Sequence, residues 1–184
     1  MRNTFKFSTL KNRTKNIFLF LFIVFCFSLS GSGQINFPND YLGTWKGNLT
    51  LYPSLKEIPM SLQLGPAITK DSVYKYILTY EGATNDVREY ELHVRDKKQG
   101  LFHVDEKNGI ILEEKLLGNK LSSVFSVSGS FLQITLELLT DEIVFEVYSW
   151  PAKVSKTTVS KEDEETYTVD SYKMNAYQKA VLKK

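Results

Sequence analysis

The chain has 184 residues, with 23 lysines and arginines, 21 aspartates and glutamates, and one cysteine. A formal net charge of +2 excludes the strongly basic surface that nucleic-acid-binding domains normally carry, and a single cysteine excludes a disulfide within the chain. The length suffices for one domain with a sizeable core, so the fold must be stabilised by packing.

The first 33 residues have the pattern of a secretory signal peptide. Residues 1–16 carry five basic and no acidic side chains, residues 17–29 carry no charge, and residues 30–33 are serine and glycine. This order predicts a cleaved signal peptide, and we place the cleavage after Gly33. A membrane-spanning helix is less well supported, because the apolar segment is shorter than the roughly 20 residues that such a helix needs. We expect an exported protein, periplasmic or extracellular, with no membrane span after cleavage. An uncleaved N-terminal anchor is the alternative.

The only cysteine, Cys26, lies inside the apolar segment and follows Phe25. A lipid-attachment cysteine normally follows small residues, so we do not expect lipidation. Without residues 1–33 the chain has 18 basic and 21 acidic residues, a net charge of −3, and no cysteine. The mature chain therefore gives no indication of a nucleic-acid partner.

From residue 44 onward, apolar and polar residues alternate in short runs, which is typical of half-buried β-strands. Turn-forming residues such as Asn108-Gly109 separate the runs, and short turns force each strand to lie antiparallel to the one before it. Nine strands are expected, at residues 44–52, 58–64, 74–80, 88–95, 101–105, 110–116, 121–127, 132–138 and 143–147.

A meander of this length leaves two open edges unless it closes on itself. Closure into an up-and-down barrel removes both edges, so we predict an all-β, antiparallel up-and-down barrel of about nine or ten strands, formed by residues 34–184 as a single domain. Residues Tyr167–Met174 are expected to form the closing strand against the first one. The polar, charged residues 152–165 are expected to form a loop or flap, and residues 176–184 a helical turn or a strand extension.

The run Gly43-Thr44-Trp45-Lys46-Gly47 opens the first strand. A large aromatic at that position can plug one end of a barrel, while Gly43 permits a sharp entry into the strand and Gly47 permits a bend or a close approach. We therefore assign Gly43, Trp45 and Gly47 a structural role at a closed end.

A Gly-x-Trp at the head of the first strand, followed by an antiparallel meander of this length, resembles the calycin group, which includes lipocalins and fatty-acid-binding proteins. The run G-T-W-x-G is also similar to small exported proteins of Bacteroidetes. The resemblance implies a lipocalin-like barrel that holds a ligand in its lumen. In lipocalins an arginine near the last strand covers the tryptophan, and here we expect Lys173 to substitute. Nitrobindin-like barrels bind haem through a late histidine, but no histidine follows residue 103, so no haem or other cofactor is expected.

Five side chains are expected to face the lumen and to bind the ligand: Tyr74, Tyr76, Tyr80, Arg88 and Tyr90. A guanidinium can hold a carboxylate through two hydrogen bonds while the rings contact an apolar tail. The run Arg88-Glu89-Tyr90 also resembles the Arg-x-Tyr pair that grips the carboxylate in fatty-acid-binding proteins. The alternative is that Arg88 lies at a strand end and extends to water.

The remaining polar residues predict neither a metal site nor an active site. A metal site needs three or four converging ligands, and the two histidines, His93 and His103, with a few surface acids such as Asp105 do not supply them. No catalytic motif with a serine or cysteine nucleophile is present. Glu114 alternates into the lumen-facing set, for which we favour a bulge or a barrel end over a wet lumen.

The sequence therefore predicts a non-enzymatic, exported protein that binds a small, mostly apolar molecule, with or without a carboxylate, in the barrel lumen. The alternative is an interaction protein whose barrel is filled by its own side chains. Such a protein would bind another exported protein or a glycan through its outer face or through residues 152–165. The oligomeric state is not predicted.

Overall fold

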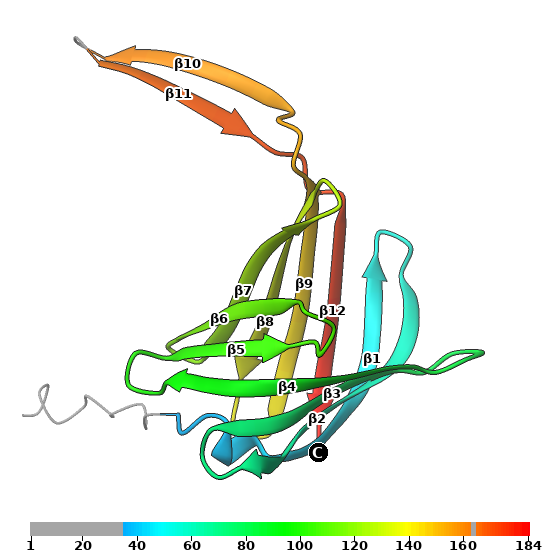
Figure 1. Cartoon of the computed structure of the whole chain (residues 1–184). Helices are drawn as coiled ribbons and strands as arrows, with labels where there is room; N and C mark the ends of the chain where they lie inside the picture. Colours follow the sequence, from blue (N-terminus) through cyan, green and yellow to red (C-terminus); the bar gives the residue numbers. More distant parts are fainter. Residues whose placement is uncertain (1–34, 163–164) are drawn as a thin grey trace, which may run out of the picture. The chain divides into compact units, whose positions relative to one another are not determined.

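The computed structural model describes residues 35–162 and 165–184. The predicted signal peptide and its cleavage site lie outside these residues. Apart from one short 3₁₀ helix, every regular element in the described part of the chain is a β-strand (Figure 1).

The elements follow one another in a regular order along the chain. Their bounds are η1 Asn39–Tyr41, β1 Gly43–Tyr52, β2 Lys56–Thr69, β3 Val73–Tyr80, β4 Asp86–Asp96, β5 Leu101–Asp105, β6 Ile111–Leu117, β7 Lys120–Val127, β8 Ser130–Leu138, β9 Glu142–Pro151, β10 Lys156–Glu162, β11 Glu165–Ser171 and β12 Ala176–Lys183.

Ten of the strands form a closed antiparallel barrel in the order β1-β12-β9-β8-β7-β6-β5-β4-β3-β2. The first nine strands are a simple meander, and β12 lies between β9 and β1 to close the wall (Figure 1). The seam pairs Leu49 of β1 with Ala180 of β12. The predicted all-β up-and-down barrel is therefore confirmed.

The prediction for the closing strand is wrong. Tyr167 belongs to β11, which pairs only with β10, and the barrel is closed instead by β12. The prediction of a loop over residues 152–165 is also wrong for the part that forms β10. Its run Thr157-Thr158-Val159 is rich in β-branched residues, which favour a strand, and a two-stranded ribbon exposes both faces, so polar residues do not prevent it.

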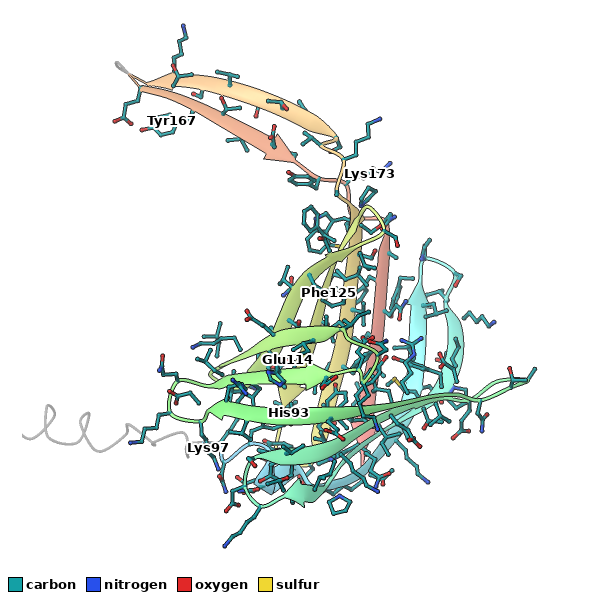
Figure 2. All side chains as sticks on the ribbon, in the orientation of Figure 1. His93, Lys97, Glu114, Phe125, Tyr167 and Lys173 are labelled. Atoms are coloured by element: carbon teal, nitrogen blue, oxygen red, sulfur yellow. The ribbon has the colours of Figure 1, made fainter. Side chains whose placement is uncertain are left out.

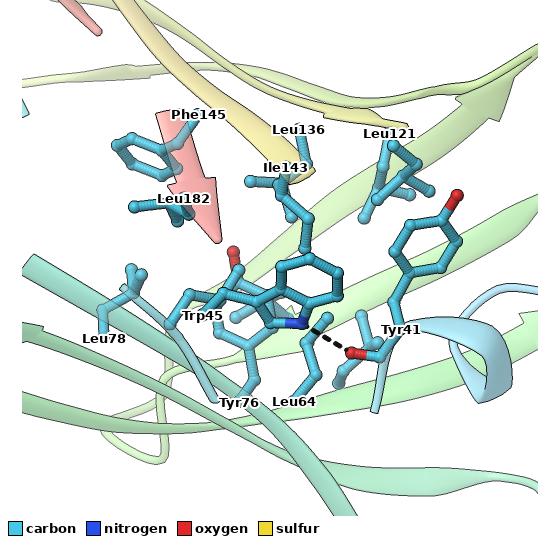
Figure 3. Close-up of a cluster of buried hydrophobic side chains, with 14 of the residues drawn as sticks. Tyr41, Trp45, Leu64, Tyr76, Leu78, Leu121, Leu136, Ile143, Phe145 and Leu182 are labelled. Atoms are coloured by element: carbon cyan, nitrogen blue, oxygen red, sulfur yellow. Dashed lines mark hydrogen bonds between the residues drawn. The ribbon is translucent and has the colours of Figure 1, made fainter. Parts of the chain in front are cut away.

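One end of the barrel is closed by the segment that leads into β1. Trp45 is 1% exposed, and its indole Nε1 donates a hydrogen bond of 2.8 Å to the carbonyl oxygen of Tyr41 (Figure 3). The Nζ of Lys184 lies 4.8 Å from the centre of the Trp45 ring. A cation therefore covers this tryptophan, but it follows the closing strand β12 and is not the expected Lys173.

Two glycines allow this arrangement. Gly43 enters β1 with a φ of +130°, which side chains rarely permit. At Gly47 a Cβ would come within 2.3 Å of the carbonyl oxygen of Val181 in β12. Strand β12 can therefore approach β1 closely, which helps to complete the wall.

Burial changes along the barrel from one end to the other. Near the closed end, lumen-facing side chains such as Leu136, Ile143 and Leu182 are at most 2% exposed and pack around Trp45 (Figure 3). Further along the same strands, Ile134 and Val147 face the same interior but are only half-buried. Lumen-facing side chains are thus fully buried at one end and partly exposed further along, in the part that we call the accessible half of the lumen.

Candidate functional site

Four of the five predicted binding residues come together on β3 and β4. Tyr76 pairs with Tyr90 across the two strands, and Leu78 pairs with Arg88. Tyr76 is 3% exposed, and burial, followed by the nearby Glu114, raises the pKa of its hydroxyl. These residues therefore form one polar cluster that runs from the core toward the strand ends.

Arg88 lies at the outer limit of this cluster. Its side chain is 47% exposed and its Nη2 donates to Asp86 Oδ2 at 2.8 Å, while the guanidinium lies 5.0 Å from the centre of the Tyr80 ring. A ligand carboxylate at this position would have to compete with Asp86. The geometry therefore matches a partly hydrated strand-end arginine with its own carboxylate partner.

Tyr74 lies apart from the cluster, at the closed end. It is 2% exposed, and its hydroxyl forms a hydrogen bond of 2.9 Å with Asn39 Oδ1 in η1. This contact ties β3 to the segment that closes the barrel. Tyr74 thus has a structural partner rather than a position in the accessible half of the lumen.

Glu114 of β6 is the most unusual polar residue inside the barrel (Figure 2). The β5–β6 register runs without a shift and pairs Glu114 with Phe102, so the bulge, one of the two explanations that we favoured from the sequence, is wrong. The side chain is 9% exposed, and its Oε2 has no hydrogen-bond partner among the described residues. Burial raises the pKa of the Glu114 carboxyl to about 8.

A carboxyl group with this pKa is mostly protonated at neutral pH. The protonated form can donate one hydrogen bond and accept others, whereas a carboxylate can only accept. An unused polar atom deep in a protein is costly unless something satisfies it. Glu114 therefore keeps a neutral hydrogen-bonding group with an unsatisfied oxygen inside the barrel.

The two histidines lie side by side on the outer face of the barrel. His93 pairs with His103, and their ring centres are 4.6 Å apart. Glu91 Oε2 lies 3.4 Å from His93 Nε2 without hydrogen-bond geometry. Burial and the neighbouring His93 lower the pKa of His103. Nowhere in the part of the chain that the structure describes do three or more potential metal ligands converge.

A groove of about 570 Å³ opens on the outer face of the barrel, over β7, β8 and β9. Its aromatic lining is Tyr148, Trp150 and Tyr172. Thr135, only 4% exposed although it points away from the lumen, contributes to the polar lining. The groove is therefore a concave site that lies outside the lumen.

Sequence reasoning missed this groove because it treated outward positions as solvated. The signal was present in the alternation itself: Tyr148 and Trp150 occupy the outward positions of β9, next to Val147 and Ser149, which face the lumen. Large aromatics at successive outward positions of a strand are an exposed apolar feature that needs a reason.

Comparisons with known proteins identify no family for the chain. No protein-family model matches it, and no curated protein matches it. Among solved structures the chain is similar to EF1p2_mFAP2b bound to DFHBI, with a TM-score of 0.37 and 7% identity, over 79% of this chain and 94% of that chain. Within residues 35–162 and 165–184, no helix has the length and apolar character needed to cross a membrane.

Proposed function

We propose that this protein is an exported, non-enzymatic carrier or receptor that binds a small, mostly apolar molecule in the accessible half of the barrel lumen. The observation that carries the proposal is the burial gradient. Lumen-facing residues are sealed around Trp45 at one end, whereas Ile134 and Val147 remain half-buried further along the same strands. A concave, largely apolar site with few polar groups is the usual form of a small-molecule site.

Glu114 narrows the class of ligand. The protonated carboxyl presents an unsatisfied hydrogen-bonding atom inside an apolar wall, so a ligand with a neutral acceptor, such as a carbonyl oxygen, would complete its hydrogen bonding. A ligand carboxylate has weaker support for two reasons. The Arg88 guanidinium is already paired with Asp86, and the same burial that keeps the Glu114 carboxyl uncharged would disfavour a charged ligand group beside it.

A calycin-like origin is part of the proposal. It is supported by the Gly43-x-Trp45 run at the head of β1, by the sealing of that end of the barrel around Trp45, and by the cation of Lys184 over the indole ring. Export is supported by the composition of residues 1–33.

Titration with Nile red, a neutral apolar dye that carries a carbonyl group, tests the lumen. We expect saturable binding with a blue-shifted dye emission. Ile134 pairs with Ser123 on one side and with Val147 on the other, so Ile134→Trp would place a large ring in the accessible half. This variant is expected to weaken binding by at least tenfold, which corresponds to about 1.4 kcal/mol.

The matched control is Val124→Trp, which adds the same side chain to β7 at a position that is 62% exposed on the outer face. It is expected to bind the dye as the unmodified protein does. Equal affinities for the Ile134→Trp and Val124→Trp variants, with both folded by circular dichroism, would rule out a lumenal site.

A further inference from the structure

Aromatic rings form a continuous row across the outside of the barrel. Tyr52, Tyr177 and Tyr148 come from the neighbouring strands β1, β12 and β9, in which they are paired directly. Their rings are stacked, with centres 5.2 Å apart for Tyr52 and Tyr177 and 4.8 Å apart for Tyr148 and Tyr177. The row ends at Tyr148, which lines the outer groove.

A second aromatic group borders the same groove. Phe131 of β8 lies 6.0 Å from Trp150 of β9 and 6.1 Å from Tyr172, measured between ring centres. Tyr172 is 44% exposed and follows the end of β11. Aromatic rings from β8, from β9 and from the segment after β11 thus gather at the groove. A cluster of exposed aromatic rings of this kind usually marks a binding site.

Polar side chains lie beside the rings in the lining of the groove. Ser122 and Thr135 share a hydrogen bond of 3.1 Å, and no hydrogen bond joins the amide of Gln133 to another described residue. Glu146 accepts a hydrogen bond of 2.5 Å from the Tyr177 hydroxyl. The groove therefore presents hydroxyl, amide and carboxylate groups beside the aromatic faces.

The lining of the groove carries one charge of each sign, and each charged group already has a polar partner. Lys120 and Glu146 are the charged residues that line it. Lys120 Nζ lies 3.6 Å from Glu137 Oε2, and Glu146 is held by Tyr177. Neither sign of charge predominates, so the groove is suited to an uncharged ligand with many polar atoms rather than to an anion, a cation or a strongly charged peptide.

We propose that this outer groove binds a neutral saccharide. A pyranose ring has an apolar face of C–H groups and a rim of hydroxyls. Such a face can stack on the aromatic rings of Tyr148, Trp150 and Tyr172, which are apolar on their faces and carry a polar group at the edge. The hydroxyl rim can exchange hydrogen bonds with Gln133 and Thr135. The site is independent of the lumen and of the ligand proposed for it.

Affinity electrophoresis tests the proposal with the purified protein. The probes are gels that contain barley β-glucan, xylan, galactomannan, dextran or starch, and a gel without polysaccharide gives the reference mobility. At least one polysaccharide is expected to slow the protein. The oligosaccharide of the retarding polymer is then titrated while tryptophan emission is recorded, because Trp150 lines the groove whereas Trp45 is 1% exposed.

Two variants locate the site. Trp150→Ala and Tyr172→Ala are each expected to weaken saccharide binding by about tenfold or more, as for a ring that anchors an interface. Tyr172 lies between β11 and β12, so its variant decides the result if Trp150→Ala does not fold. The matched control is Tyr167→Ala, which removes a 48% exposed ring from β11 and is expected to bind normally.

Three results would overturn the proposal. The first is that none of the five polysaccharides slows the protein. The second is that Tyr172→Ala binds the retarding saccharide as tightly as the unmodified protein does. The third is that Ile134→Trp weakens saccharide binding as much as it weakens Nile red binding, which would place the sugar in the lumen.

Discussion

At the scale of single residues, Glu114 is the side chain that sequence reasoning placed correctly and then set aside. Alternation places it on the lumen-facing side of its strand, but the cost of burying a carboxylate favours a bulge or a barrel end. The structure keeps the register and places the residue among apolar side chains, with a pKa raised to about 8. Alternation predicts which side a residue faces, whereas the protonation state depends on neighbours from distant strands.

The raised pKa predicts a specific dependence of stability on pH. Between the ordinary value of 4.5 and about 8, the folded state holds a proton that the unfolded state releases, so the free energy of unfolding falls as pH rises, by at most about 1.4 kcal/mol per pH unit. Below 4.5 both states are protonated and this contribution is constant. Glu114→Gln keeps the shape without the titration and is expected to stabilise the protein at pH 8 but not at pH 4.5.

Urea unfolding at a series of pH values between 4.5 and 8 measures this difference. The control is Glu89→Gln, which changes an exposed glutamate on the outer face of β4 and is expected to leave the pH profile of the unmodified protein unchanged. Parallel profiles for the unmodified protein and for Glu114→Gln would contradict a buried, protonated Glu114.

At the scale of elements, the two C-terminal strand predictions failed for different reasons. The polar run of β10 was assigned to a loop because it has no apolar face, but a ribbon that pairs only with β11 needs none. In β12 the lumen-facing positions are Ala176, Gln178, Ala180 and Leu182, an alternation weakened by small and polar residues. Strand β12 closes the barrel because it pairs with both β1 and β9. The local sequence of a strand does not show which distant strands it will pair with.

Removal of the β10–β11 ribbon and removal of β12 are expected to differ sharply in their effect on stability. Lys156 pairs with Ser171 at the base of the ribbon, so replacement of residues 156–171 by Asn-Gly should leave the melting temperature within about 2 °C, because surface changes outside the core cost little. A stop codon after Asn175 removes β12 and should abolish cooperative melting, because it uncovers two strand edges and part of the core. Circular dichroism melting curves measure both, and a large loss of stability without the ribbon would contradict its independence.

At the scale of the whole molecule, the architecture followed from sequence more readily than the sites did. Regular turns after short strands left few alternatives to a closed meander, since an open one would expose both edges. The outer groove depends on how side chains from β7, β8 and β9 converge, and such convergence is set by register and twist rather than by any one strand.

Export also belongs to this scale, because loss of residues 1–33 would change the formal charge from +2 to −3. We expect protein recovered from its own host to have the mass of a chain that begins at Gln34 and to bind an anion exchanger at neutral pH. The control is the same gene expressed with residues 2–33 deleted, which should match it in mass apart from the initiating methionine. Recovery of the intact 184-residue chain from the host would contradict cleavage.

The pairing of Leu49 with Ala180 joins the first barrel strand to the last. Contacts between residues so distant along the chain slow folding, because a long stretch must be ordered before they can form. The first strand must wait, with its edge unpaired, until β12 has been synthesised or translocated. A chaperone that binds unpaired strand edges would therefore be expected to bind β1 before the barrel closes. The seam between β1 and β12 should be the last part of the wall to gain protection from hydrogen exchange during refolding.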